Sequence, residues 1–328
     1  MVEIIDAYSH LLPEAVLDEL LEVHPHEEVE NLKNAPQLTD VDKRLNDMDE
    51  YGIDKQVLTI AHPPIWQGLS DEDCLAVTKL ANDEIRRLAD EYPDKFIPAA
   101  TLPRLTGGFV DEAERALNDL DMVGVQTFSH IDGQFLDDPA FDPFYSVLDD
   151  HEVPLWIHPQ LYDWHDYTAE DTWIYKALGW PFDTTVALAR LVFNGVFERH
   201  QNLEVISHHL GGFLPYVDER IRSFYRSRSE DPEMYVGTVA DLSQPLDDYF
   251  ARIYADTAVS PQGKMLTLEC GHEFFGDDNL LFGVDYPFGP NAGRYWLSEG
   301  VPEVEAMDVS DEVRQKIFAD NIRNLLDL

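Results

Sequence analysis

The sequence has few cysteines, few basic residues and no long apolar run, and each shortage excludes a class of protein. Its 328 residues include only two cysteines, so a disulfide-stabilised secreted scaffold is excluded and two reduced thiols are expected. No apolar run approaches the ~20 residues that cross a bilayer, and the first residues lack the basic and apolar regions of a secretory signal. We therefore expect a soluble cytoplasmic protein.

Basic residues are scarce relative to acidic ones. The chain has 23 Lys and Arg against 64 Asp and Glu, which gives a formal net charge of −41. A field of this sign repels nucleic acid and anionic membranes, so we expect neither as a partner. The expected partners are a small-molecule substrate and, as a candidate assembly, a second copy in a homodimer.

This acidity does not indicate disorder, because 44% of the residues are hydrophobic and 11% are aromatic. In a folded chain, so large an excess of acidic residues indicates adaptation to molar salt, as in the cytoplasm of a halophile. An unusually acidic protein of a mesophile is the alternative.

Short apolar runs alternate eight times with stretches of helical periodicity. The expected strands lie in the opening stretch 3–13 and at 55–60, 96–101, 123–128, 154–158, 203–207, 253–256 and 280–284. Eight strands alternating with helices are typical of an α/β protein with a (β/α)₈ TIM barrel, here as a single domain over residues 1–328. A doubly wound open sheet is the alternative, but no glycine-rich fingerprint follows the first strand, so a dinucleotide site is not predicted.

Polar side chains gather where the expected strands end, which is where the chemistry of a barrel takes place. These residues are Tyr8, His10, His62, Thr101, Arg104, His130, His158, His208, His209, Asp256 and Asp285. Imidazoles and a carboxylate from separate strands can bind Zn²⁺ or a similar divalent ion, with water completing the ligand set. Taken singly, each of these residues could instead have a structural role.

The opening stretch ends with Tyr8 and His10, which share one face of a strand because they are two residues apart. Two metal ligands at this spacing would bind one ion from a single strand end, but the first of the pair is a phenol with a pKa near ~10. Tyr8 could bind the metal weakly, donate a hydrogen bond to metal-bound water, or mark a barrel that has no metal.

Four motifs resemble those of one family of enzymes. They are IDAYSHLLP at 5–13, WIHP at 156–159, ISHHLGGFLPY at 206–216 and LFGVDYP at 281–287. In this order they resemble the amidohydrolase-related branch of the metal-dependent hydrolase superfamily, which includes aminocarboxymuconate-semialdehyde decarboxylase and the γ-resorcylate-type decarboxylases. The resemblance runs nearly from end to end.

The resemblance implies roles for individual residues. His10, His158 and Asp285 take the places of metal ligands, His209 matches the catalytic histidine, and Tyr8 stands where a second histidine or a glutamate is usual. Asp285 is also a candidate for proton transfer. Two arginines are candidates to bind a substrate carboxylate, Arg44 from a helix motif and Arg104 after the third strand, because guanidinium pairs bidentately with carboxylate. Trp66 and Trp164 either line the substrate pocket or fill space above the barrel.

Two reactions are compatible with this set of residues, with zinc as the expected metal. The first is non-oxidative decarboxylation of a small unsaturated or aromatic carboxylic acid, with His209 or Asp285 delivering a proton to carbon. The second is hydrolysis of an ester, lactone or amide by a metal-bound water that Asp285 deprotonates. A metal-free barrel that binds a ligand is the third alternative.

We expect the thermal unfolding midpoint to rise with KCl concentration, because the Debye length falls from about 10 Å at 0.1 M to about 3 Å at 1 M and screens repulsion among the acidic residues. The measurement is a melting curve recorded by circular dichroism across this range. Equal stability with and without salt would show that the acidity is not an adaptation to salt.

Overall fold

Eight parallel strands close into a barrel, as the sequence predicts. The computed structural model describes residues 2–25, 27–60, 63–160, 174–231, 233, 240–259 and 265–328. One run of hydrogen-bonded strands is β1, β2 and β3, and a second is β4, β5, β8, β9, β10 and β11. Their bounds are β1 Ile5–His10, β2 Lys55–Thr59, β3 Phe96–Pro98, β4 Ala100–Thr101, β5 Val125–Phe128, β8 Leu155–His158, β9 Val205–Ser207, β10 Ile253–Asp256 and β11 Leu280–Leu281.

Two further hydrogen bonds join these runs into a closed ring. The Ala7 amide donates to the Phe282 carbonyl at 2.8 Å, which connects β1 to the chain that follows β11. At the other junction, the expected strand at 96–101 is divided at Ala99 into β3 and β4. Pro98 has no N–H to donate, but its carbonyl accepts from Val123 at 3.1 Å, so the ladder continues toward β5.

Strand β1 contains one more residue than β2 between their paired segments. Asp6 lies opposite Gln56, whereas Ser9 lies opposite Leu58, so three steps along β1 match two steps along β2. An extra residue of this kind is a β-bulge, and it exchanges the faces to which the following side chains point. The bulge therefore allows Ala7 before it and Tyr8 after it both to contribute to the inner core.

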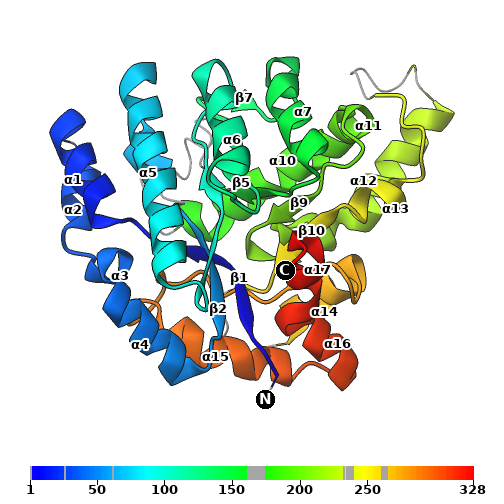
Figure 1. Cartoon of the computed structure of the whole chain (residues 1–328). Coiled ribbons are helices and arrows are strands. Elements are labelled where there is room, and N and C mark those ends of the chain that lie inside the picture. Colours follow the sequence, from blue (N-terminus) through cyan, green and yellow to red (C-terminus); the bar gives the residue numbers. More distant parts are fainter. Residues whose placement is uncertain are drawn as a thin grey trace.

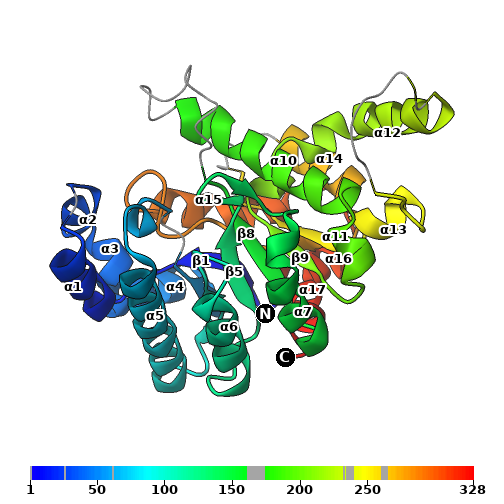
Figure 2. The same ribbon diagram turned by 90° about the horizontal axis from the view of Figure 1, so that it is seen from above.

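Helices surround the barrel (Figures 1 and 2). Those that cover the strands, with the shorter helices between them, are α1 Glu14–Val23, α2 Glu27–Leu32, α3 Pro36–Thr39, α4 Val41–Tyr51, α5 Asp71–Glu91, α6 Gly108–Asn118, α7 Asp142–His151, α10 Trp180–Phe193, α11 Val196–Arg199, α12 Leu214–Glu230, α13 Leu246–Phe250, α14 Leu266–Phe275, α15 Arg294–Glu305, α16 Asp311–Gln315 and α17 Asn321–Leu326. Arg323 of α17 donates to Glu3 at 2.6 and 2.8 Å, which holds the two ends of the chain close together.

Capping residues explain where α4 begins and ends and where α5 begins. Asp40 accepts from the Lys43 amide at 2.9 Å at the start of α4, and Gly52 ends that helix with φ 76°. Ser70 accepts from the Asp73 amide at 3.1 Å at the start of α5.

Three helical segments are irregular. Pro302 lies inside helix α15. The last helix is interrupted by a π-helical turn at Lys316–Asp320. Helix α10 begins at Trp180 and ends at Phe193, where Gly195 with φ 76° separates it from α11.

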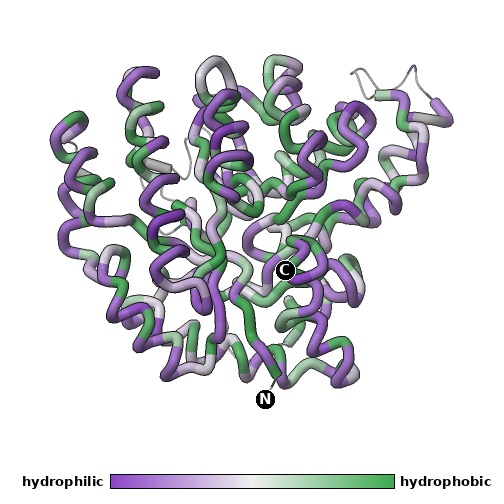
Figure 3. Tube along the Cα trace, viewed as in Figure 1, coloured by the Kyte–Doolittle hydropathy of each residue, from purple (hydrophilic) through white to green (hydrophobic). Residues whose placement is uncertain are grey.

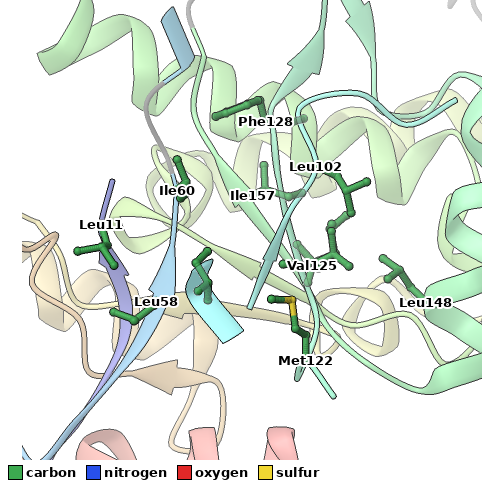
Figure 4. Close-up of a cluster of buried hydrophobic side chains, with 14 of the residues drawn as sticks. Leu11, Leu58, Ile60, Leu102, Met122, Val125, Phe128, Leu148 and Ile157 are labelled. Carbon is green, nitrogen blue, oxygen red and sulfur yellow. The ribbon is translucent and has the colours of Figure 1, made fainter. Parts of the chain in front are cut away.

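The apolar core has two parts because side chains alternate along each strand. A small inner cluster fills the barrel and includes Tyr8, Val57, Trp156, Ile206 and Leu281. A larger cluster lies between the strands and the helices, and Figure 4 shows Leu58, Leu102, Val125 and Ile157 in this layer. Figure 3 shows apolar strands inside and mixed polarity along the helices.

None of the helices in the described ranges combines the length with the apolar character that crossing a bilayer requires. Both cysteines are free thiols, with Cys74 buried and Cys270 partly buried.

We expect Trp156→Phe to lower the free energy of unfolding by about 1–3 kcal/mol, because the Trp156 indole nitrogen donates to the Ala7 carbonyl at 3.0 Å inside the barrel. Trp156→Ala should cost about 3–5 kcal/mol through the cavity that it leaves. The measurement is urea unfolding at constant high KCl. The control is Phe224→Ala, which removes a ring that is 49% exposed on α12. Equal losses for Trp156→Phe and the control would contradict this account of the inner core.

Candidate functional site

Three imidazoles and one carboxylate meet at the carboxyl ends of the strands. His10 ends β1, His158 ends β8, His208 follows β9, and Asp285 lies four residues beyond β11. The Nε2 atoms of His10 and His208 each lie 3.1 Å from Oδ1 of Asp285. One nitrogen atom from each of the three histidines lies within 4.8 Å of the others.

The alternation of side chains explains why these residues point inward. Trp156 and Ile206 belong to the inner core, and His158 and His208 lie two residues further along the same chain segments. Side chains two residues apart in a strand share a face, so the imidazoles form the layer above the apolar floor of the barrel. The bulge in β1 gives His10 the same orientation.

His10 is held by a chain of hydrogen bonds that fixes its tautomer. The Thr59 hydroxyl donates to the Ser9 carbonyl at 3.1 Å. Its oxygen is therefore left to accept from Nδ1 of His10 at 2.9 Å. Nε2 of His10 then carries the lone pair, and this atom faces Asp285.

His158 and His208 are oriented in the same way through Nδ1. Nδ1 of His158 donates to the Pro159 carbonyl at 2.7 Å. Nδ1 of His208 donates to the Asp256 carboxylate at the end of β10, and both side chains are fully buried. Asp256 also accepts from the amides of His209 and Ala258, each at 3.0 Å, so its own position is fixed. All three imidazoles therefore present Nε2 to the site.

The electrostatics of the site centre on Asp285. Burial alone would raise the pKa of Asp285, but the charge of His208 and the other histidines beside it hold this pKa well below its usual range. Burial lowers the pKa of His10 and of His158, and Asp285 opposes this effect. Burial also disfavours charge on His208, but Asp256 and Asp285 outweigh it and raise the pKa of His208 to about 10.

His209 lies beside the cluster and is more accessible than the other histidines. Its backbone has φ 53°, a left-handed conformation that turns the chain sharply after β9. Its Nε2 atom lies 3.6 Å from Oδ2 of Asp285, and its side chain is 18% exposed. Trp180 stacks on the imidazole with ring centroids 6.3 Å apart and an interplanar angle of 21°.

Tyr8 is buried among the same side chains. Its ring lies 4.2 Å from the His208 ring and 5.3 Å from the His10 ring, measured between centroids. Burial, with Asp256 and Asp285 nearby, raises the pKa of the Tyr8 hydroxyl well above its usual value. The hydroxyl oxygen is buried and has no hydrogen-bond partner among the described residues.

Aromatic rings surround the imidazoles. Trp180 lies 5.6 Å from His158, Phe288 lies 5.5 Å from His10, and Phe128 lies 6.1 Å from His158, all between centroids. The polar cluster is therefore bordered by flat apolar surfaces, which are suited to a planar ligand.

Arg44 is fully buried behind β1. Its guanidinium donates to the His10 carbonyl and, at 2.8 Å, to the amide oxygen of Gln56, and it lies 4.7 Å from the Tyr286 ring centroid. Burial lowers the pKa of Arg44 to about 10. These contacts give Arg44 the role of positioning His10, and binding of a substrate carboxylate by Arg44 stays a prediction.

The other residues proposed for substrate binding are placed as follows. Arg104 pairs with Asp71 and Asp132 and donates to the Leu69 carbonyl at 2.8 Å, so its described contacts are structural. Trp66 is buried on the short helix Pro63–Trp66. Trp164 lies outside the described residues.

Three residues of the site were given no role from the sequence. From the sequence, His208 and Asp256 are only polar residues at strand ends, and Trp180 is not singled out. The alternation of side chains beyond β9 could have identified His208, because His208 follows inward-facing Ile206 by two residues. No sequence pattern indicates that Trp180 stacks on His209.

The donor atoms fit a divalent metal ion. Metal-bound histidine typically donates its other ring nitrogen to a carbonyl, hydroxyl or carboxylate, as the three histidines do here. Zn–N bonds of 2.0–2.1 Å place tetrahedral ligands about 3.3 Å apart. The 3.1 Å separations of His10 and His208 from Asp285 are close to this value.

The chain is similar to known proteins over most of its length. The model of the Amidohydrolase family matches residues 5–328. The chain is 26% identical over 252 residues to 2-amino-3-carboxymuconate-6-semialdehyde decarboxylase of Dictyostelium discoideum, covering 76% of this chain and 67% of that protein. It is 29% identical over 294 residues to the gamma-resorcylate decarboxylase of Rhizobium sp. (strain MTP-10005), covering 84% and 86%.

A solved structure shares the fold. The 5-carboxyvanillate decarboxylase of Novosphingobium aromaticivorans, in complex with manganese and 4-hydroxy-3-methoxy-5-nitrobenzoic acid, superimposes with a TM-score of 0.86 at 22% identity, covering 99% of this chain and 96% of that one.

We expect Arg44→Met to lower the free energy of unfolding by about 3 kcal/mol, because the His10 carbonyl and Gln56 lose their buried donor. Arg104→Met is the control, since its partners Asp71 and Asp132 are 89% and 69% exposed and such pairs contribute about 1 kcal/mol or less. Both are measured by urea unfolding at high KCl. Unchanged stability of Arg44→Met together with a raised KM would assign Arg44 to the substrate instead.

Proposed function

The chain belongs to the amidohydrolase family, and we propose that it is a metal-dependent, non-oxidative decarboxylase of a small aromatic or unsaturated carboxylic acid. The observation that carries this proposal is the cluster of inward-facing imidazoles around Asp285, bordered by aromatic rings. The similar proteins named above are decarboxylases of acids of this kind.

We propose that His10, His158 and Asp285 hold one divalent ion. When bound, the ion would supply positive charge that orients the oxygen atoms of the substrate. Nitrogen-rich ligand sets favour Zn²⁺, whereas the similar 5-carboxyvanillate decarboxylase was solved with manganese. Zinc is our proposal for this chain, and metal analysis of the purified protein tests it.

The residues beside this site supply the proton. Decarboxylation breaks the bond from the substrate carbon to the carboxylate, leaves the electron pair on that carbon, and requires one proton to replace CO₂. Nε2 of His209 and Oδ2 of Asp285 lie 3.6 Å apart. His209 is the better of the two candidates to deliver this proton, because the pKa of Asp285 lies well below its usual range. Trp180, stacked on His209, keeps the imidazole in place and excludes water from that side.

We further propose that the protein works in a cytoplasm of high salt concentration and assembles as a homodimer. The free thiols of Cys74 and Cys270 fit a reducing compartment. The net charge of −41 fits molar salt.

We expect His158→Ala to lose the bound metal and the decarboxylase activity together. The assay uses γ-resorcylate and 5-carboxyvanillate, the acids in the names of the similar decarboxylases, and measures CO₂ release and metal content in high KCl. His272→Gln is the control, since His272 pairs with Asp277 at 2.8 Å on α14, outside the cluster. Activity that survives in His158→Ala would contradict the proposed ligand set.

The same assay separates decarboxylation from hydrolysis. Decarboxylation releases CO₂ and takes no oxygen from solvent. Hydrolysis of an ester, lactone or amide would instead place labelled solvent oxygen in the product, and absence of any bound divalent ion in the wild-type protein would contradict both reactions.

A further inference from the structure

We propose that His208, and not Tyr8, is the fourth protein ligand of the metal, so that the complete set is His10, His158, His208 and Asp285. This inference rests on the proposed function only in requiring that a divalent ion binds. The fourth ligand would then come from the segment after β9, and not from Tyr8 in β1.

The position of His208 is the first reason. In the part of the chain that the structure describes, two groups of side chains have donor atoms close enough to hold an ion, one formed by His10, His158 and His208 and the other by His208, His209 and Asp285. His208 is the member that they share. Its Nε2 atom and that of His10 are equidistant from the same oxygen of Asp285, at 3.1 Å, as expected for three donors arranged around one ion.

The second reason is the support behind His208. The imidazole donates Nδ1–H to Asp256, which is itself fixed by two backbone amides. A carboxylate that orients a histidine in this way is the usual outer partner of a metal ligand and increases its basicity. Both side chains are fully buried, so the arrangement is rigid. To hold an ion, His208 would use an Nε2 atom that carries no proton, while its Nδ1 proton would remain with Asp256.

Tyr8 lacks these features. A tyrosine hydroxyl is protonated at neutral pH and must lose its proton to bind a metal firmly. In the structure its buried oxygen has no described partner that would accept the proton or orient the oxygen. The Tyr8 ring instead packs on His208 with centroids 4.2 Å apart, so the two side chains share the space in which one ligand fits.

The test is a titration of chelator-treated full-length protein with Co²⁺ in high KCl. Visible absorption reports the ligand set, and competition with a chelator gives the dissociation constant. The variants are Tyr8→Phe, His208→Gln and Asp256→Asn, with His272→Gln as the matched histidine control. Circular dichroism establishes that each variant is folded.

We expect Tyr8→Phe and His272→Gln to bind one Co²⁺ per chain with the affinity and spectrum of the wild type. Loss of the carboxylate that orients a metal-binding histidine weakens metal binding about 10–100-fold. We expect Asp256→Asn to weaken Co²⁺ binding by a factor in this range. His208→Gln loses the ligand itself and should weaken Co²⁺ binding by at least about 100-fold. The spectrum of His208→Gln should also change.

A double variant protects the test against misfolding of His208→Gln. Tyr8→His combined with His208→Gln returns a histidine to β1, and we expect it to bind Co²⁺ more tightly than His208→Gln alone. Loss of Co²⁺ binding in Tyr8→Phe, with His208→Gln unaffected, would overturn the inference and leave the proposed function intact. Failure of the wild type to bind any divalent ion would instead contradict the proposed function itself.

Discussion

The carboxylate of Asp285 is the group around which the site is built. A carboxylate that is removed from water without compensation is very costly, so its burial requires positive or hydrogen-bonding partners on every side. His208, which follows β9, is the charged hydrogen-bonding partner, and His10 at the end of β1 and His209 after β9 border the same carboxylate. The left-handed backbone at Asp285, with φ 57°, is the conformation that directs the carboxylate toward them.

Helix α4 holds the residues around Asp285 in position. The His10 amide donates to the Tyr286 carbonyl at 2.7 Å, and the His10 carbonyl accepts from Arg44 on α4. The Tyr286 hydroxyl in turn donates to Asp47 of α4 at 2.8 Å. One helix thus fixes both the end of β1 and the loop that carries Asp285, and the two halves of the cluster keep their spacing because they share this support.

Much of the fold and part of the site could be predicted from the sequence, for physical reasons. Eight apolar runs alternating with amphipathic segments fix the barrel, and caps such as Asp40 and Gly52 fix helix ends locally. The barrel then brings His10 close to both His158 and Asp285, and the binding of one metal ion by these three residues stays a prediction. The role of His208 depends on its distances to Asp256 and Asp285, which join segments 48 and 77 residues away, and no local pattern encodes such distances. Arg44 is a second example. The sequence alone does not show whether Arg44 positions His10 or binds the substrate, and only the burial of its guanidinium favours the first role.

The bulge in β1 has a consequence for how this strand tolerates insertions and deletions. Shortening the segment between Asp6 and Ser9 by one residue would let β1 pair evenly with β2 and would make the sheet more regular. His10 would keep its pairing with Thr59 and its place in the barrel interior. The deletion would instead remove one of the two successive inward side chains, Ala7 and Tyr8, that the bulge makes possible, so the extra residue of β1 adds volume to the inner core.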